Sequence, residues 1–96
     1  MRVLVNVEIA TPEGNEMIRS GRMTPALQKM LAQLQPEAAY FYPRNGRRAM
    51  TLVVDAPEAA GLPSLVEPFW LELGAAVEVL PCMTAEEVAA GIERLA

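Results

Sequence analysis

Residues 1–9 read MRVLVNVEI, a segment in which aliphatic side chains occupy every second position, at Val3, Val5, Val7 and Ile9. Alternation with a period of two is typical of a β-strand that has one buried face. We expect the aliphatic face to lie beneath helices. Leu4, Asn6 and Glu8 are then expected to point to the opposite face of the sheet.

Helical patterns follow this strand. A short helical turn is predicted over residues 11–18, and Gly21 ends it. A longer helix is predicted next, with Thr24 as its N-cap, and Pro36 forbids its continuation. The apolar positions of this helix recur at i, i+3, i+4 and i+7, which predicts a core-facing stripe of Leu27, Met30, Leu31 and Leu34.

The middle of the chain predicts a β-hairpin and a third helix. Residues 38–42 and 48–55 have strand patterns, and Asn45-Gly46 between them favours a type I′ turn. Residues 62–73 have an apolar helical side, in which Pro68 is predicted to kink or restart the helix. Gly74 is expected to end it.

The last part of the chain predicts a strand over residues 75–80 and a final helix. Thr84 and Glu87 have the spacing of a capping box at the start of that helix. Its apolar residues are expected to face inward, and they are Val88, Ile92 and Leu95.

The order of these elements predicts one α+β domain over residues 1–96, without repeats or linkers. Strand, helix, strand, strand, helix, strand is the order of the ferredoxin-like βαββαβ fold, here with an extra C-terminal helix. Its antiparallel four-stranded sheet has the first and third strands at the centre. Pro43 and Pro81 border the second and fourth strands, as expected of edges, where a missing hydrogen-bond donor is tolerated.

Charge and cysteine content restrict the partners and the compartment. Eight Lys and Arg residues against twelve Asp and Glu residues give a net charge of -4, which disfavours nucleic acid. The single Cys82 cannot form an internal disulfide, so we expect a cytoplasmic protein. No apolar run has the length of a membrane span or the form of a signal peptide, and a membrane location is therefore not expected.

The face of the sheet away from the helices predicts a homodimer. Its expected residues mix apolar and polar side chains: Leu4, Asn6, Glu8, Tyr40, Tyr42, Thr51 and Val53, with either Val77 and Val79 or Glu78 and Leu80. Two copies that pack sheet against sheet would cover this face. The alternative is a solvated open face with a few exposed apolar side chains.

Four segments carry a family resemblance over nearly the whole chain: PEAAYF (residues 36–41), NGRR (45–48), EPFW (67–70) and AAVEVLPCM (75–83). They resemble uncharacterised small bacterial proteins of the dimeric α+β barrel superfamily, with a distant similarity to muconolactone isomerase in the last segment. The resemblance implies a homodimer with facing sheets. Functions in that superfamily are too varied for one of them, or any catalytic residue, to be transferred.

The absence of histidine excludes several chemistries. Catalytic Ser-His-Asp and Cys-His arrangements, histidine zinc sites and an imidazole base are unavailable, and no glycine-rich phosphate loop occurs. We expect no cofactor and no metal. Proton transfer would need a carboxylate, a tyrosine or the thiol, and the candidate catalytic residues are Glu8, Glu67 and Tyr42. Glu8 and Glu78 lie mid-strand, and solvation or pairing with an arginine is the competing interpretation.

Aromatic and cationic residues gather in the predicted hairpin. Arginines could hold the carboxylate of a small organic acid while an aromatic ring covers its apolar body, and the candidate ligand-binding residues are Tyr40, Arg44, Arg48 and Trp70. A solvated hairpin tip is the structural alternative. Three functions remain open: a cofactor-free isomerase or monooxygenase-like enzyme, a non-catalytic binding or regulatory module, and a structural subunit of a larger complex.

Overall fold

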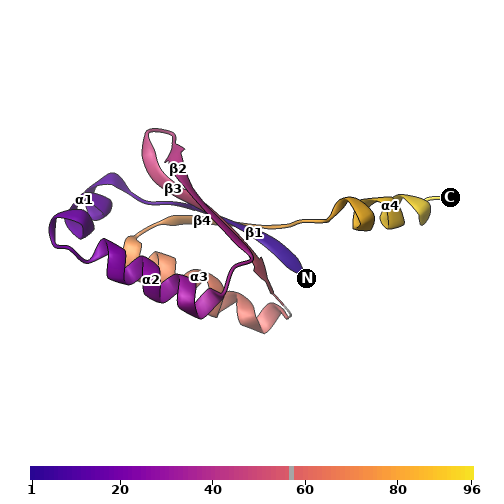
Figure 1. Ribbon diagram of the computed structural model, residues 1–96, viewed down its shortest axis with the longest axis horizontal. Coiled ribbons are helices and arrows are strands. Elements are labelled where there is room, and N and C mark those ends of the chain that lie inside the picture. The colour runs from indigo at the N-terminus through magenta and orange to yellow at the C-terminus, as the bar shows by residue number, and fades with distance from the viewer. Residues whose placement is uncertain (57) are drawn as a thin grey trace.

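A computed structural model describes residues 1–56 and 58–96 as an α+β fold with a four-stranded antiparallel sheet (Figure 1). The strands are β1 (Arg2–Glu8), β2 (Ala38–Arg44), β3 (Arg47–Asp55) and β4 (Ala76–Pro81). The helices are α1 (Thr11–Arg19), α2 (Met23–Leu34), α3 (Leu62–Leu73) and α4 (Ala85–Glu93), with a 3-10 turn at Ala59–Gly61. This architecture is compatible with a ferredoxin-like fold.

The strand order in the sheet is β2-β3-β1-β4, so the prediction that the first and third strands are central is confirmed. β1 lies antiparallel to both of its neighbours, with Asn6 opposite Thr51 on β3 and opposite Glu78 on β4. Pro43 lies within the edge strand β2, and Pro81 is the last residue of the other edge strand. Both strands of the hairpin extend further toward the turn than predicted.

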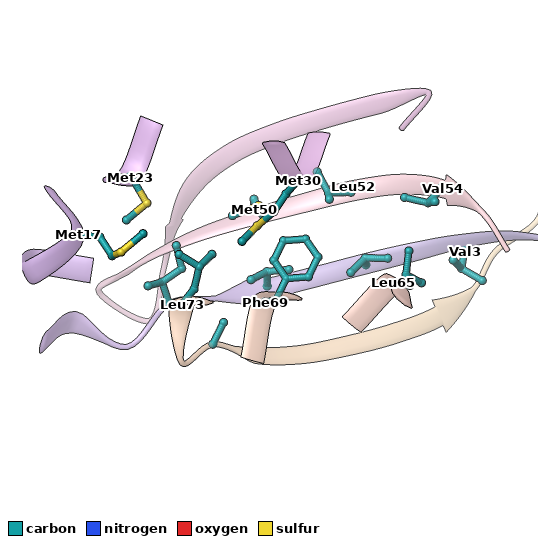
Figure 2. Packing of buried hydrophobic residues seen from close by; sticks show 14 residues of the cluster. Val3, Met17, Met23, Met30, Met50, Leu52, Val54, Leu65, Phe69 and Leu73 are labelled. Carbon is teal, nitrogen blue, oxygen red and sulfur yellow. The ribbon is translucent and has the colours of Figure 1, made fainter. Parts of the chain in front are cut away.

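The core lies between one face of the sheet and helices α1, α2 and α3 (Figure 2). Alternate β1 residues are buried, as their pattern predicts, and Val5 is fully buried. Phe69 and Leu73 of α3 are also fully buried, and Met50 and Leu52 of β3 pack in the same cluster. In α2, Met30 is buried and the other three stripe residues are partly buried against the cluster.

The turn residues take the predicted conformations. Asn45 and Gly46 have φ angles of 53° and 72°, the positive values that a type I′ turn requires. Gly74 ends α3 with a φ of 57°. Pro68 was predicted to kink or restart α3, and of these two effects the restart does not occur, because the helix runs through Pro68. Buried residues on both sides of Pro68, Leu65 and Phe69, stabilise the helix by packing on the sheet.

The prediction that Thr24 caps α2 is also wrong. The helix begins at Met23, with Arg22 as its N-cap. The first four N–H groups of a helix lack intrahelical partners, so Pro25 is tolerated anywhere in the first turn and does not fix where the helix begins. Burial of Met23 stabilises the earlier start.

The prediction for the last helix is half right. α4 begins with the predicted capping box of Thr84 and Glu87. However, Val88, Ile92 and Leu95 do not face inward: they are 39%, 60% and 84% exposed. β4 directs the chain away from the body, so α4 projects from it (Figure 1).

Candidate functional site

A cavity of about 670 Å³ lies between the α1–α2 side of the molecule and the β2–β3 hairpin. We call it the hairpin cavity. Its walls are mainly apolar, and they include Ile9, Met23, Leu27, Phe41, Pro43 and Met50. The polar residues at its boundary are Thr11, Asn15, Tyr42, Arg47 and Arg48. An apolar chamber with a few polar groups is the usual form of a small-molecule site.

Arg48 is the best-positioned polar group of this cavity. Its Nη1 donates a hydrogen bond of 3.1 Å to Oδ1 of Asn15 on α1. Gly14 makes room for the guanidinium, because a Cβ at that position would lie 2.8 Å from Nη1 of Arg48. An arginine has five N–H donors, so the bond to Asn15 leaves others for an oxyanion.

The other predicted ligand-binding residues do not join Arg48. Tyr40 lies on the opposite face of the sheet and is 69% exposed. Trp70 lies on α3 and is half exposed, outside the residues that form the cavity. Arg44 lines a different hollow, described below. The structure therefore does not bring these four residues together at one site: Tyr40 and Arg44 lie on the open face, whereas Arg48 and Trp70 lie on the helix side, on different elements.

The sequence also failed to indicate several residues of the cavity. Asn15 and Phe41 contribute to it, but no local pattern distinguishes Asn15 from an ordinary polar helix residue. Phe41 alternates with Tyr40 and Tyr42 along β2, and this alternation places its ring on the helix side of the sheet. The alternation along β2 could therefore have identified Phe41 as a residue of the helix side, whereas nothing in the sequence could have identified Asn15.

A row of hydrogen-bonded side chains crosses all four strands on the open face of the sheet. The Oη of Tyr42 lies 2.5 Å from Oγ1 of Thr51, which donates to Oδ1 of Asn6 at 2.8 Å. Nδ2 of Asn6 then donates to Oε1 of Glu78 at 3.1 Å. We call these four residues the polar row. The pair Glu78 and Leu80, rather than Val77 and Val79, therefore belongs to the open face.

Glu8 lies beside the polar row and pairs with an arginine. Nη1 of Arg47 is 3.3 Å from Oε1 of Glu8. Glu8 also lines a hollow of about 190 Å³ with Asn6, Arg44 and Glu78. Of the predicted catalytic residues, Glu8 and Tyr42 thus share the open face. Glu67 is exposed on α3, and the structure does not bring it to either of them.

Two charged groups with shifted pKa values lie where α4 joins the sheet. A hydrogen bond and the charge of Glu37 raise the pKa of Arg2. Hydrogen bonds from the backbone and side chain of Thr84 lower the pKa of the Glu87 carboxyl. Arg2 also pairs with Glu87, with Nη1 and Oε1 3.5 Å apart. Neither Arg2 nor Glu87 lines the hairpin cavity.

Within residues 1–56 and 58–96, no group of three or more acidic or cysteine side chains is placed to hold a metal ion. Among the helices of this described part, none has the length and apolar character needed to cross a bilayer.

Comparison of the chain with known protein families and with curated proteins finds no match. The functional argument therefore depends on the α+β fold, the hairpin cavity and the open face.

Proposed function

We propose that this protein is a cytoplasmic homodimer of the dimeric α+β barrel type that binds a small apolar molecule carrying a carboxylate. The observation that carries the proposal is the guanidinium of Arg48 at the boundary of the apolar hairpin cavity. The family resemblance of the sequence and the strand order both agree with this class of protein.

The ligand class follows from the chemistry of the hairpin cavity. Arg48 offers N–H donors that match the two oxygens of a carboxylate, and Asn15 fixes one end of the guanidinium. The apolar walls suit an aromatic or aliphatic body. A volume of about 670 Å³ lies in the usual range for small-molecule sites.

The polar row supports a dimer in which the open faces meet. Buried polar groups must be hydrogen-bonded, and Tyr42, Thr51, Asn6 and Glu78 already bond to one another within one chain. The neighbouring positions on this face are apolar: Ala38, Val53, Leu4 and Leu80 lie opposite one another across the strands. A second copy could cover this face without leaving the polar row unsatisfied.

Binding without catalysis is favoured at the hairpin cavity. Glu8 and Glu67 do not line it, and the hydroxyl of Tyr42 bonds to Thr51 on the opposite face. An alternative function has its own supporting observation. Glu8 and Glu78 line one hollow on the open face, and Tyr42 is linked to Glu78 through the polar row, so a dimer seam would enclose all three, as a cofactor-free isomerase or monooxygenase-like enzyme would need.

The test is calorimetric titration with benzoate, phenylacetate and the uncharged analogue toluene. We expect the acids to bind more tightly than toluene, and Arg48→Gln to weaken acid binding about 10- to 100-fold because a charge-assisted contact is lost. Arg19→Gln is the matched control, since Arg19 lies at the end of α1 outside the cavity. Equal affinity of the wild type and Arg48→Gln for the acids would overturn the proposed ligand site.

Light scattering tests the dimer separately. We expect twice the chain mass at micromolar concentration, and a single-chain mass would overturn the proposed assembly. Turnover of an acid in these titrations would favour the enzymatic alternative.

A further inference from the structure

α4 has no covering partner within the described part of its own chain. Val88 and Ile92 of α4 and Leu95 just after it are exposed, and Glu87 in the first turn forms an ion pair with Arg2. Figure 1 shows α4 projecting from the sheet at the end opposite the hairpin.

A helix of this kind needs packing in order to be stable. α4 has nine residues, and isolated helices shorter than about 12–15 residues are marginal in water. Gly91 lies in its interior and lowers its helix propensity further. The capping box provides hydrogen-bond partners for backbone N–H groups at the start of α4, but it covers none of the apolar side chains.

The dimensions of the chain indicate how much surface lacks a partner. Its accessible surface is 6353 Å², whereas a compact monomer of 96 residues would expose about 5,400 Å². Its radius of gyration is 15.3 Å, against about 12.5 Å for a compact domain of this length. The excess surface, about 1,000 Å², is close to the roughly 800 Å² that each partner buries in a stable protein interface.

The charges of the chain indicate that the missing partner is a second copy. α4 and the residue after it have three glutamates, at positions 86, 87 and 93, of which Glu87 already pairs with Arg2, and one arginine, Arg94. The hairpin has three arginines, Arg44, Arg47 and Arg48, and in the described residues an ion pair is formed only by Arg47. α4 cannot reach the hairpin of its own chain, because β4 and β2 are opposite edges of the sheet.

The edge strand β2 offers an apolar surface beside these arginines. Tyr40 and Phe41 are 69% and 52% exposed, on opposite faces of the strand. Pro43 has no backbone N–H, so an added strand could not pair along the whole edge. A helix needs no such pairing, because its backbone hydrogen bonds are internal.

We propose that α4 of each copy lies along β2 of the second copy, with its apolar side chains on Tyr40 and Phe41. Glu86 and Glu93 of α4 then lie near the hairpin, where Arg44 has no ion pair within the described residues. This arrangement rests on the proposed dimer and deepens the proposed ligand site, because Phe41 and Pro43 also line the hairpin cavity. The second copy's α4 closes the open side of that cavity, so the site is complete only in the dimer.

The test is disulfide formation between two variants that are mixed before oxidation. Cys82→Ser removes the native thiol from every protein used. Tagged Phe41→Cys is mixed with untagged Ile92→Cys, and we expect a tagged–untagged covalent dimer at least ten-fold more abundant than in the control. The control replaces Phe41→Cys by Leu71→Cys, an exposed position on α3 away from β2. A disulfide needs Cα atoms within about 7 Å, so random collisions between chains should form the 41–92 and the 71–92 disulfides equally rarely.

The outcomes separate this inference from the proposed function. A dimer by light scattering with no excess of the 41–92 disulfide overturns the placement of α4 and leaves the facing-sheet dimer intact. A monomer overturns both. Ile92→Glu provides a second measurement. We expect this variant, which retains Arg48, to bind benzoate several-fold more weakly than the wild type. Wild-type affinity for benzoate would overturn closure of the cavity by α4.

Discussion

Replacement of Thr51 by valine tests whether the open face of the sheet is covered. Thr51 has one hydroxyl proton, which goes to Oδ1 of Asn6 at 2.8 Å, so Tyr42 must donate its own proton to Oγ1 of Thr51 at 2.5 Å. Thr51→Val keeps the shape and the strand propensity but removes both hydrogen bonds. On a covered face the hydroxyl of Tyr42 and the amide oxygen of Asn6 lose their partners without gaining water.

The expected magnitude follows from these two bonds. Each of the two groups that is left buried and unsatisfied costs about 1–3 kcal/mol, so we expect a loss of about 2–6 kcal/mol in the free energy of unfolding. On a solvated face water would replace both partners, and the loss would stay below about 1 kcal/mol. A loss of 2 kcal/mol moves the urea midpoint by about 1–2 M for a domain of this size.

Urea unfolding followed by circular dichroism at two protein concentrations measures this loss. The wild-type midpoint should rise with concentration, because unfolding of a dimer is linked to its dissociation. Thr24→Val is the control, since Thr24 is exposed on α2. If Thr51→Val unfolds within about 0.5 kcal/mol of that control, the argument from the polar row is refuted.

Three further predictions concern the core, the hairpin and α4. Phe69→Ala should destabilise the protein by about 3–5 kcal/mol in urea unfolding, because it opens a cavity at a fully buried position, and a loss below 1 kcal/mol would contradict the described core. Gly46→Ala should cost about 1–2 kcal/mol in the same assay, because its φ of 72° strains any side chain although no atom lies within 4 Å of the added Cβ. Hydrogen bonds from Thr84 lower the pKa of Glu87 in the folded state. The stabilisation of α4 by the capping box should therefore be complete above about pH 4.3, the pKa of an unfolded glutamate, and should be lost as the pH falls through the lower pKa of folded Glu87. Amide exchange of α4 measures this loss, and an identical pH dependence in Glu87→Gln would contradict it.

The strands and the turn could be predicted because their determinants are local. The alternation of Val3, Val5 and Val7 specifies a face whatever the rest of the chain does, and Asn45-Gly46 is among the few pairs that adopt two positive φ angles without strain. The prediction places the start of α2 two residues late. Pro25 fits at any position of the first turn and so does not determine the start of the helix, which the burial of Met23 determines instead.

The candidate site was less predictable because a distant contact creates it. Arg48 and Asn15 are 33 residues apart, and their hydrogen bond exists because α1 packs beside the end of the hairpin. The sequence showed that the hairpin is rich in arginine. It did not show that alternation along the strands would send Arg48 to the helix side and Arg47 to Glu8.

The error at α4 has a physical reason that bears on the proposed assembly. The spacing of Val88, Ile92 and Leu95 indicates that one side of the helix needs cover, but it carries no information about which chain supplies that cover. The prediction that these residues face inward assumed that the sheet of the same chain would reach them, and the sheet ends at Pro81. Since a nine-residue helix gains most of its stability from packing, the same pattern that failed to place α4 in its own core now argues for its position on a second copy.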